Sequence, residues 1–333
     1  MTETSASALP WTGEESRAYQ DAEMIAAAWY QARDALVPFS GWMTWKKNGG
    51  GKEYLFYGHD RAGNGQSLGV RSAETEARMQ AFRDGKAAAQ QREAALRAQV
   101  ATQARFVRAA RVNRMPRDAA KLLRVFERTP YRDALVVVGT HALYAYEAAA
   151  GVRFVPGLTA TRDVDLLWDS KQQLEVGVGL LPDERPGFLD VLRQLDATFT
   201  VSAEHSFRVT SAQGLMVDFL MAEPDDGRKP KAGDKVRPIG MTGQSWLLGS
   251  TPMKQIAFSD DGYPIRLNVP QPTLFAAHKR WVAQQRGRAA IKKDRDIAQA
   301  AAVFDLLKDR LSDQVSVTRK MPAELKKYLP ARR

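Results

Sequence analysis

Leu135-Val136-Val137-Val138-Gly139-Thr140-His141 begins the part of the sequence that decides the fold, which continues with Thr161-Arg162-Asp163-Val164-Asp165-Leu166-Leu167 and Leu215-Met216-Val217-Asp218-Phe219-Leu220. Successive side chains of a strand alternate between its faces, so Asp163 and Asp165 should project together while Val164 turns into the core. Paired carboxylates repel each other unless a cation lies between them. Asp218, flanked by apolar residues, is the natural third carboxylate on an adjacent strand, and the three predict a divalent metal site.

The segment around Gly139 and Thr140 reads as a strand, a turn of small residues and the start of a helix over residues 141–147. The start of a helix presents free backbone N–H groups and the positive end of its dipole, which suits phosphate. Asp163 follows Gly139 by 24 positions. We expect residues 148–159 to form a loop, because Gly151, Pro156 and Gly157 are turn residues.

These three segments resemble the nucleotidyltransferase superfamily that includes polymerase beta. The resemblance implies a small mixed sheet with helices and a Gly-Thr turn, Gly139-Thr140, that holds the phosphates of a nucleoside triphosphate (NTP). It also implies that Asp163, Asp165 and Asp218 bind two Mg²⁺ ions. The separation between the turn and the Asp-x-Asp pair is longer than the commonest spacing in that superfamily.

The composition restricts the class of protein. The 333 residues are 44% hydrophobic and include no cysteine, so disulfides, thiol nucleophiles and cysteine-ligated zinc are excluded. Residues 1–10 lack the basic and apolar regions of a signal peptide, and no stretch is long enough to span a bilayer. We therefore expect a globular, cytoplasmic protein without a membrane partner.

Positive charge favours a polyanionic partner. The formal net charge is +11, and residues 105–132 hold nine basic residues. A helix that follows Pro116 would carry four of them, Arg117, Lys121, Arg124 and Arg128, on one face opposite its apolar positions. This face is predicted to bind RNA. The alternative is an ordinary solvated face.

The N-terminal third combines helices with an aromatic hairpin. Helices are predicted over residues 14–36 and 72–111, with Ser72 as an N-cap, and a hairpin is predicted between them around Asn48-Gly49-Gly50-Gly51. The aromatic and basic residues of this hairpin could stack on exposed bases. Alternatively, its aromatic side chains pack on a helix as core.

The C-terminal part is helical, with Lys279 on a helix over residues 273–286 and Lys292-Lys293-Asp294-Arg295-Asp296 on the next. From about Ala134 to Leu307 the chain is similar to the AbiE-type and MenT-type nucleotidyltransferase toxins, and residues 67–76 look like an uncharacterised bacterial branch with the same fold. The resemblance implies that Lys279, Asp294 and Asp296 serve the nucleotide. Otherwise Lys279 is a surface lysine and the aspartates are helix-pair or capping residues. His141 and His278 are expected to be structural, because magnesium prefers oxygen ligands.

The predicted fold class is α+β, a nucleotidyltransferase-like mixed sheet with helices, preceded by a hairpin and a long helix and followed by a helical C-terminal unit. The corresponding division is residues 1–130, 131–270 (the catalytic core) and 271–333. Surface loops are expected over residues 177–186 and 223–238, and a hairpin over residues 253–269 is expected to extend the sheet.

The predicted function is Mg²⁺-dependent transfer of a nucleoside monophosphate (NMP) from NTP to an acceptor hydroxyl. Lys279 would also take part in catalysis, and Asp218 could serve as general base. The charge and the toxin resemblance favour RNA as acceptor, most simply the 3′ end of tRNA, with a toxin–antitoxin or phage-defence role and an antitoxin as partner. The alternatives are nucleotidylation of a protein hydroxyl and a non-catalytic nucleic-acid-binding protein on the same scaffold.

Overall fold

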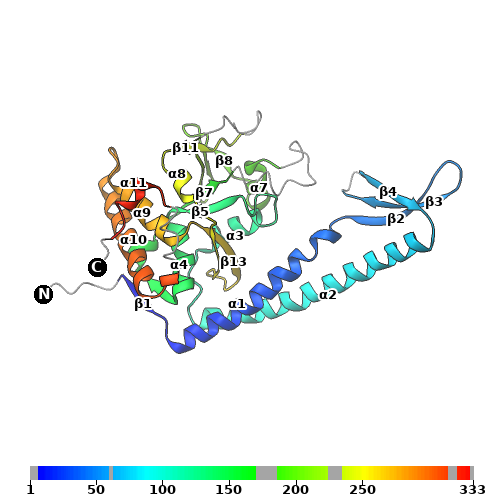
Figure 1. The fold of residues 1–333 in the computed structure, drawn as a ribbon, viewed down its shortest axis with the longest axis horizontal. Helices are drawn as coiled ribbons and strands as arrows, with labels where there is room; N and C mark the ends of the chain where they lie inside the picture. The colour runs from blue at the N-terminus through cyan, green and yellow to red at the C-terminus, as the bar shows by residue number, and fades with distance from the viewer. Residues whose placement is uncertain (1–6, 60–62, 170–185, 224–234, 314–320, 331–333) are drawn as a thin grey trace. The chain divides into compact units, whose positions relative to one another are not determined.

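The chain forms two compact units. The computed structural model describes residues 7–59, 63–169, 186–223, 235–313 and 321–330. We call Met1–Arg17 with Ala110–Arg333 the core unit, and Ala18–Ala109 the N-terminal unit. Each is described by itself (Figure 1).

A mixed sheet organises the core unit. Its strands lie in the order β5 (Leu135–Val138), β7 (Asp163–Trp168), β10 (Met216–Ala222), β9 (Arg208–Thr210) and β8 (Thr200–Val201), and β11 (Ile239–Met241) also pairs with β10. β10 is parallel to β7 and β11, whereas β5 is antiparallel to β7 and β9 is antiparallel to both β10 and β8. The β-branched and apolar runs that predicted β5, β7 and β10 form its buried centre. The predicted α+β fold with a nucleotidyltransferase-like mixed sheet is confirmed.

Helices surround this sheet (Figure 1). They are α3 (Arg117–Phe126), α4 (Leu143–Ala150), α5 (Pro156–Thr159), α7 (Phe188–Leu195), α8 (Gln244–Leu247), α9 (Pro272–Ala283), α10 (Ala290–Asp309) and α11 (Ala323–Lys326). Aromatic rings join two of them to the sheet: Phe188 of α7 stacks on Phe219 of β10 at 4.5 Å, and Phe126 of α3 meets Phe219 at 5.9 Å. This apolar layer fixes β10, and with it Asp218.

Two segments differ from the prediction. The expected loop over residues 148–159 contains α5 and the strand β6 (Val152–Phe154), which pairs with β1 (Ala8–Pro10). Partner strands far away in the sequence stabilise such a short strand, so local turn residues mislead. The hairpin β12 (Met253–Phe258) and β13 (Pro264–Val269) forms a sheet of its own, and the expectation that it extends the main sheet is wrong. Most of the two predicted surface loops, residues 177–185 and 224–234, lies outside the described residues.

The N-terminal unit joins two long helices to a small sheet. α1 (Gly13–Asp34) enters it from the core unit, and α2 (Ala73–Ala109) runs beside α1, where Trp29 donates a hydrogen bond from its indole N–H to Glu93 at 2.9 Å (Figure 1). Between them lie a short 3₁₀ helix, η1 (Val37–Phe39), and the antiparallel strands β2 (Trp42–Lys47), β3 (Glu53–Gly58) and β4 (Gly65–Val70). The predicted hairpin is β2–β3. Its third strand escaped prediction because its two glycines give a weak strand signal.

Within the described ranges, no helix combines the length and the apolarity that crossing a bilayer requires.

Candidate active site

Asp163, Asp165 and Asp218 come together at one cleft of the core unit. Asp163 and Asp165 start β7, and the parallel register sets Asp218 of β10 directly opposite Asp165. The alternation predicted from the sequence holds, because Val164 between the two acids is fully buried. All three carboxylates line a cavity of about 270 Å³. The sequence prediction that Asp218 lies on a strand adjacent to the Asp-x-Asp pair is therefore correct.

Gly139 packs closely against Asp165. It opens a 3₁₀ helix, η2 (Gly139–Ala142), directly after β5, and its φ of +63° lies in the left-handed region. A Cβ at this position would lie 2.0 Å from Asp165 Oδ2. The left-handed backbone conformation and the absence of a side chain thus both allow the turn to lie close to the Asp165 carboxylate.

Thr140, the second residue of the predicted phosphate turn, also lines the cleft. Its hydroxyl accepts a hydrogen bond at 3.1 Å from Nε2 of Gln299, which also donates to the Leu158 carbonyl at 2.7 Å. Gln299 is fully buried on α10. This glutamine therefore ties the turn to the C-terminal helices, a role that only the tertiary structure reveals.

The cleft opposes ionisation of Asp165. Burial raises the pKa of Asp165 to about 7; Asp218 and Asp163 act in the same direction, while Lys279 opposes them. A carboxylate with a raised pKa beside two further carboxylates gains most from a nearby cation. Such perturbed groups are concentrated at functional sites.

Arg208 binds the third carboxylate. It lies opposite Asp218 on β9, and its Nε and Nη2 donate to Asp218 Oδ1 and Oδ2 at 2.7 and 2.6 Å. Among the residues that the structure describes, no three acidic or histidine side chains converge closely enough to hold a metal ion. The donor set nevertheless has the right chemistry, since all three groups offer the oxygens that Mg²⁺ prefers. Asp218 would have to share or release Arg208 to join a metal site.

Lys279 lines the cleft, and an ion pair with Asp296 fixes the position of its ammonium group. Its Nζ lies 2.8 Å from Asp296 Oδ1, and Arg288 donates to Asp296 Oδ2 from Nε and Nη2 at 2.8 and 2.5 Å. The Asp296 side chain is only 2% exposed, so both of its oxygens are used to hold these two cations. Asp294, by contrast, is exposed on α10 and is not among the residues that line the cleft.

Positive charge is abundant around the carboxylates. Five basic side chains line the cleft with four acidic ones: Arg208, Lys279, Arg288, Lys292 and Arg295 against Asp163, Asp165, Asp218 and Asp296. Sequence reasoning identified only Lys279 among these cations. The signal for Arg288, Lys292 and Arg295 was the density of Lys and Arg between residues 286 and 295, whereas nothing local in the sequence pointed to Arg208. A cleft with this lining can accept a polyphosphate together with cations.

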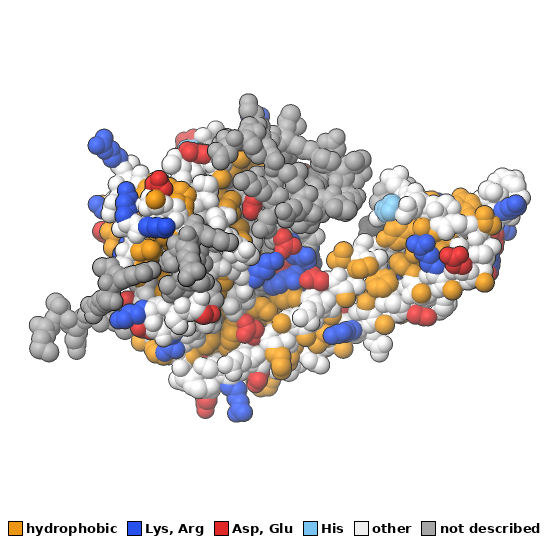
Figure 2. All heavy atoms as spheres, viewed as in Figure 1, with side chains coloured by type: hydrophobic (Ala, Val, Ile, Leu, Met, Phe, Trp, Pro, Cys, Tyr) orange, Lys and Arg blue, Asp and Glu red, His pale blue; other side chains and the backbone are white. Residues whose placement is uncertain are grey.

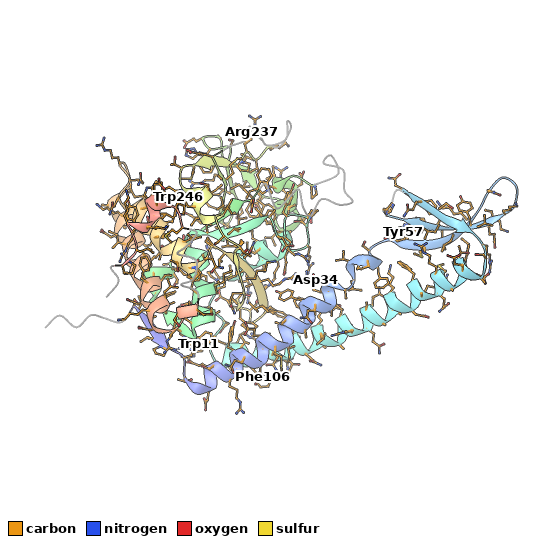
Figure 3. The ribbon with its side chains drawn as sticks, viewed as in Figure 1. Trp11, Asp34, Tyr57, Phe106, Arg237 and Trp246 are labelled. Carbon is orange, nitrogen blue, oxygen red and sulfur yellow. The ribbon has the colours of Figure 1, made fainter. Side chains whose placement is uncertain are left out.

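His141 and His278 are buried and neutral. Burial lowers the pKa of His141 to about 4, although a hydrogen bond with the Asp163 backbone opposes the shift. Burial, with Lys279 adding to it, lowers the pKa of His278 to about 3. The His278 ring packs 5.5 Å from the ring of Trp281, which in turn meets Trp246 of α8 at 4.9 Å (Figure 3). These surroundings fit the structural roles expected for both histidines.

Replacing His278 with phenylalanine should make the protein less sensitive to acid. The native state holds His278 neutral down to a pKa of about 3, whereas the unfolded chain protonates it near pH 6.5. Stability is therefore lost as the pH falls below about 6.5. His278→Phe should remove up to about 1.4 kcal/mol of this loss per pH unit. Urea unfolding of both proteins between pH 7 and pH 5 measures the difference, and parallel curves would contradict it.

The predicted basic face is exposed at three of its four positions. Arg117 and Lys121 are exposed on α3, whereas Arg128 is exposed in the turn that follows, because α3 ends at Phe126 and does not extend to Arg128 as predicted. Arg124 instead contacts Asp261 at 3.3 Å and donates to the hydroxyl of Ser259 at 2.6 Å, so it holds the turn between β12 and β13. Binding of nucleic acid by this face stays a prediction.

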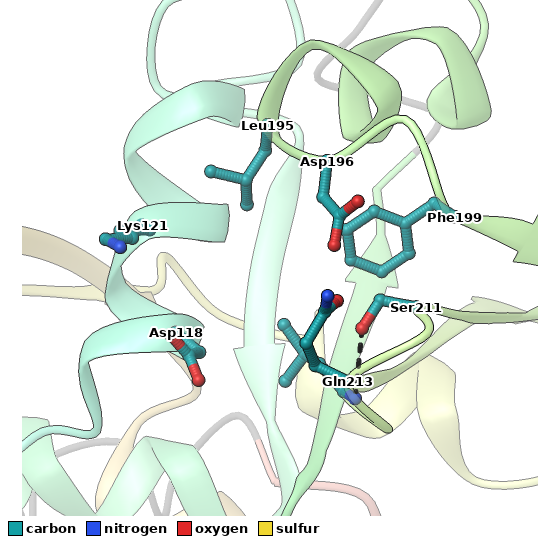
Figure 4. A pocket seen from close by; sticks show the side chains of 8 residues that line it. Asp118, Lys121, Leu195, Asp196, Phe199, Ser211 and Gln213 are labelled. Carbon is teal, nitrogen blue, oxygen red and sulfur yellow. Dashed lines mark hydrogen bonds between the residues drawn. The ribbon is translucent and has the colours of Figure 1, made fainter.

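Lys121 also borders a second cavity of about 270 Å³ in the core unit. Its other polar groups come from Asp118, Asp196, Ser211 and Gln213, and its apolar side chains are Leu195, Phe199 and Leu215 (Figure 4). Its Ser211 hydroxyl accepts a hydrogen bond from the Leu215 backbone at 3.3 Å. The opposed charges of this cavity give it no preference for an anion.

The comparison with known proteins agrees with this geometry. A family model described as Nucleotidyltransferase matches residues 117–321, more than half of the chain, and that range contains every residue that lines the cleft. No curated protein and no solved structure matches the chain significantly. The protein is accordingly an enzyme that acts on a nucleoside triphosphate and transfers a nucleoside monophosphate. By its match over most of the folded core, the chain belongs to the nucleotidyltransferase family.

Proposed function

We propose that this enzyme transfers an NMP from NTP to a hydroxyl of RNA, most simply the 3′ end of tRNA, and that it depends on Mg²⁺. The observation that carries the proposal is the cleft in which Asp163, Asp165 and Asp218 line one wall beside Gly139 and five basic side chains. Nucleotidyl transfer requires carboxylates that hold metal ions and basic side chains that bind the phosphates.

Asp163, Asp165 and Asp218 are the residues that would hold Mg²⁺. Their chemistry fits, since all three offer oxygen ligands and burial raises the pKa of Asp165 to about 7, so that a nearby cation would favour its charged form. Bound there, two ions would neutralise charge on the attacking and leaving oxygens of the transfer.

The basic side chains would bind and orient the triphosphate. Asp296 holds Lys279 and Arg288 in fixed positions, so their N–H groups are ordered before the nucleotide arrives. Gly139 and Thr140 would receive a phosphate at the turn, where the 3₁₀ helix η2 begins and its first backbone N–H groups have no partner within the helix. A carboxylate oxygen of Asp218 would accept the proton of the acceptor hydroxyl once Arg208 no longer holds both oxygens. Asp294 is exposed and does not line the cleft, so the proposal gives it no direct contact with the nucleotide.

Arg208→Gln should bind Mg²⁺ more tightly than the wild type. Arg208 competes with a metal ion for both oxygens of Asp218, so its loss should lower the half-saturating Mg²⁺ concentration about tenfold, a typical effect of one charged contact. The metal-free variant should be less stable, because Asp218 loses its partner. Thermal unfolding against Mg²⁺ concentration measures both effects, with Arg193→Gln on α7 as the control. An unchanged Mg²⁺ dependence would contradict the competition.

Charge favours RNA over a protein as acceptor. The net charge is +11, and Arg117 and Lys121 on α3 and Arg128 in the turn after it are exposed. A basic surface raises the affinity for a nucleic acid whatever the base sequence, whereas binding of a protein acceptor does not require an excess of basic residues. The resemblance to AbiE-type and MenT-type enzymes extends the proposal to a toxin–antitoxin or phage-defence role with an antitoxin partner. A non-catalytic scaffold is disfavoured, because it has no need of three clustered carboxylates.

Replacing Arg117, Lys121 and Arg128 together with glutamine should weaken RNA binding. Each lost phosphate contact should reduce the slope of log affinity against log salt by roughly one unit, while NTP binding should barely change. Arg124→Gln is the informative contrast, since Arg124 holds the β12–β13 turn and its loss should lower stability instead. Fluorescence anisotropy with labelled tRNA across a salt series measures the slope. An unchanged slope in the triple variant would mean that these three side chains form an ordinary solvated face and do not contact RNA.

The experiment that tests the proposed function incubates the protein with each α-labelled NTP, Mg²⁺, total RNA and cell extract. Label that migrates with RNA and resists protease supports the proposal. Label that resists ribonuclease and disappears with protease identifies a protein acceptor. Absence of label from both fractions under all four NTPs would contradict the proposed transfer.

A further inference from the structure

The two faces of the sheet in the N-terminal unit have different surroundings. Directly paired residues of antiparallel strands share a face. One face is anchored to α2, because Leu55 is fully buried and Tyr57 meets the Phe82 ring of α2 edge-on at 6.1 Å. We call the opposite side the outer face; by register it contains Trp42, Thr44 and Lys46 of β2, Tyr54 and Phe56 of β3, and Val70 of β4.

Aromatic rings and a lysine form a continuous surface on the outer face. The rings of Trp42 and Phe56 lie 5.7 Å apart. Lys46 extends over both of them, with its ammonium 3.4 Å from the Phe56 ring centre and 5.6 Å from that of Trp42. Gly58 makes room for this arrangement, since a Cβ there would lie 2.2 Å from the Trp42 ring. The rings are half-buried and Val70 is 59% exposed, so the surface remains accessible.

Positive charge surrounds these rings. Residues 41–71 hold five basic and two acidic residues. The carboxylate of Glu53 is bound by Arg71 at 2.6 Å and also lies 3.9 Å from the Lys47 ammonium, so the positive charge in excess is on Lys46 and on the exposed Lys52. Figure 2 shows basic side chains interspersed with hydrophobic ones over this part of the unit. Rings with a basic border match the bases and phosphates of an unpaired strand.

The lysine that lies over the two rings distinguishes between the possible partners. The centres of protein–protein interfaces are depleted in lysine. A flexible ammonium over an aromatic ring suits nucleic acid better, because a base can take the ring while the ammonium moves to the neighbouring phosphate. Duplex RNA would be a poor ligand, since its bases are stacked and paired inside the helix.

We propose that the outer face binds single-stranded RNA, with a base stacked on Phe56 and Trp42 and with Lys46 and Lys52 against the phosphates. The inference deepens the proposed function and rests on its choice of RNA as acceptor. It assigns part of acceptor recognition to the N-terminal unit, outside the range that the family model matches.

The test uses the full chain and a fluorescein-labelled oligouridylate of about 12 nucleotides, within the site size of single-strand binders. Phe56→Leu should weaken binding, measured by anisotropy without NTP, about fivefold to a hundredfold, the range for one stacked base. Phe106→Ala is the matched control. Phe106 is an aromatic residue of the same unit, 57% exposed near the far end of α2 from the sheet, and its loss should leave binding unchanged (Figure 3).

A pair of charge variants avoids any dependence on the packing of Phe56. Val70 lies directly opposite Tyr54 and is exposed, so a charged side chain fits there. Val70→Glu should weaken oligouridylate binding several-fold, and Val70→Lys should preserve or tighten it. Circular dichroism confirms that each variant is folded. The proposal would be overturned if Val70→Glu, Val70→Lys and Phe56→Leu all bound the oligonucleotide as tightly as the wild type. It would also be overturned if these variants kept RNA binding but lost self-association or the binding of a protein partner.

Failure of this inference and failure of the proposed function give different results. If RNA receives NMP but the outer-face variants bind oligouridylate normally, the outer face is not the RNA site and the function stands. If binding depends on Phe56 but no NMP reaches RNA, the outer face stands and the acceptor is wrong. Asp190→Ala, which changes an exposed acid of α7 outside the cleft, should bind the oligonucleotide like the wild type.

Discussion

Asp165→Ala is expected to abolish nucleotidyl transfer, with a loss of about a thousandfold or more, as for removal of a group that acts at the reacting centre. Asp165 lies between Asp163 and Asp218, directly against Gly139, and is the carboxylate whose pKa the cleft raises to about 7. Loss of this ligand should prevent productive cation binding. The metal-free variant should be as stable as the wild type or slightly more so, because the repulsion with the neighbouring carboxylates is relieved.

Transfer of α-labelled NMP and thermal unfolding without Mg²⁺ measure these two effects. Asp190→Ala is the control, since Asp190 is an exposed acid in the first turn of α7 and lies outside the cleft. It should retain full activity. An active Asp165→Ala enzyme would rule out a carboxylate-dependent reaction at this cleft.

Lys279→Ala should lower the transfer rate about tenfold to a thousandfold, the range for losing one charged contact in the transition state. Lys279 is 12% exposed and is fixed by Asp296, so its ammonium enters the cleft in a defined position. Negative charge increases on the leaving pyrophosphate, and a fixed ammonium stabilises it. The loss should appear in the single-turnover rate and in the affinity for NTP.

Lys308→Ala provides the matched control, because Lys308 is an exposed lysine in the last turn of α10. RNA affinity measured without NTP should be nearly the same in both variants. A Lys279→Ala enzyme that binds NTP normally and RNA weakly would contradict the assignment of Lys279 to the nucleotide. It would indicate instead that α9 recognises the acceptor.

The sequence predicts the catalytic strands well because their signals are local. A run of four β-branched and apolar residues before Gly139, the alternation around Asp163 and Asp165, and the apolar surroundings of Asp218 each identify a strand. The parallel pairing of β7 and β10 then brings the carboxylates together. Prediction fails where a partner is distant in the chain, as for β6, which pairs with β1 from residues 8–10.

The ion pairs and hydrogen bonds of the site could not be predicted from the sequence, because their partners are also distant in the chain. Arg208 meets Asp218 only through the register of β9 on β10, and Gln299 meets Thr140 across 159 positions. Asp296 was expected near the nucleotide, and it does line the cleft, but its oxygens contact Lys279 and Arg288. A residue type shows what a side chain can bind, whereas the tertiary structure decides which partner it meets. The proposed roles of these residues, and the division at residues 130 and 270, stay predictions.

The most direct test of the central claim compares two positions of the label in the same NTP. The wild-type protein is incubated with Mg²⁺, total RNA and NTP that carries the label on either the α- or the γ-phosphate. The account predicts that α-label enters RNA and γ-label leaves as pyrophosphate, with both signals absent in Asp165→Ala. Transfer of γ-label to the acceptor, or release of γ-label with no α-label in any acceptor, would contradict it.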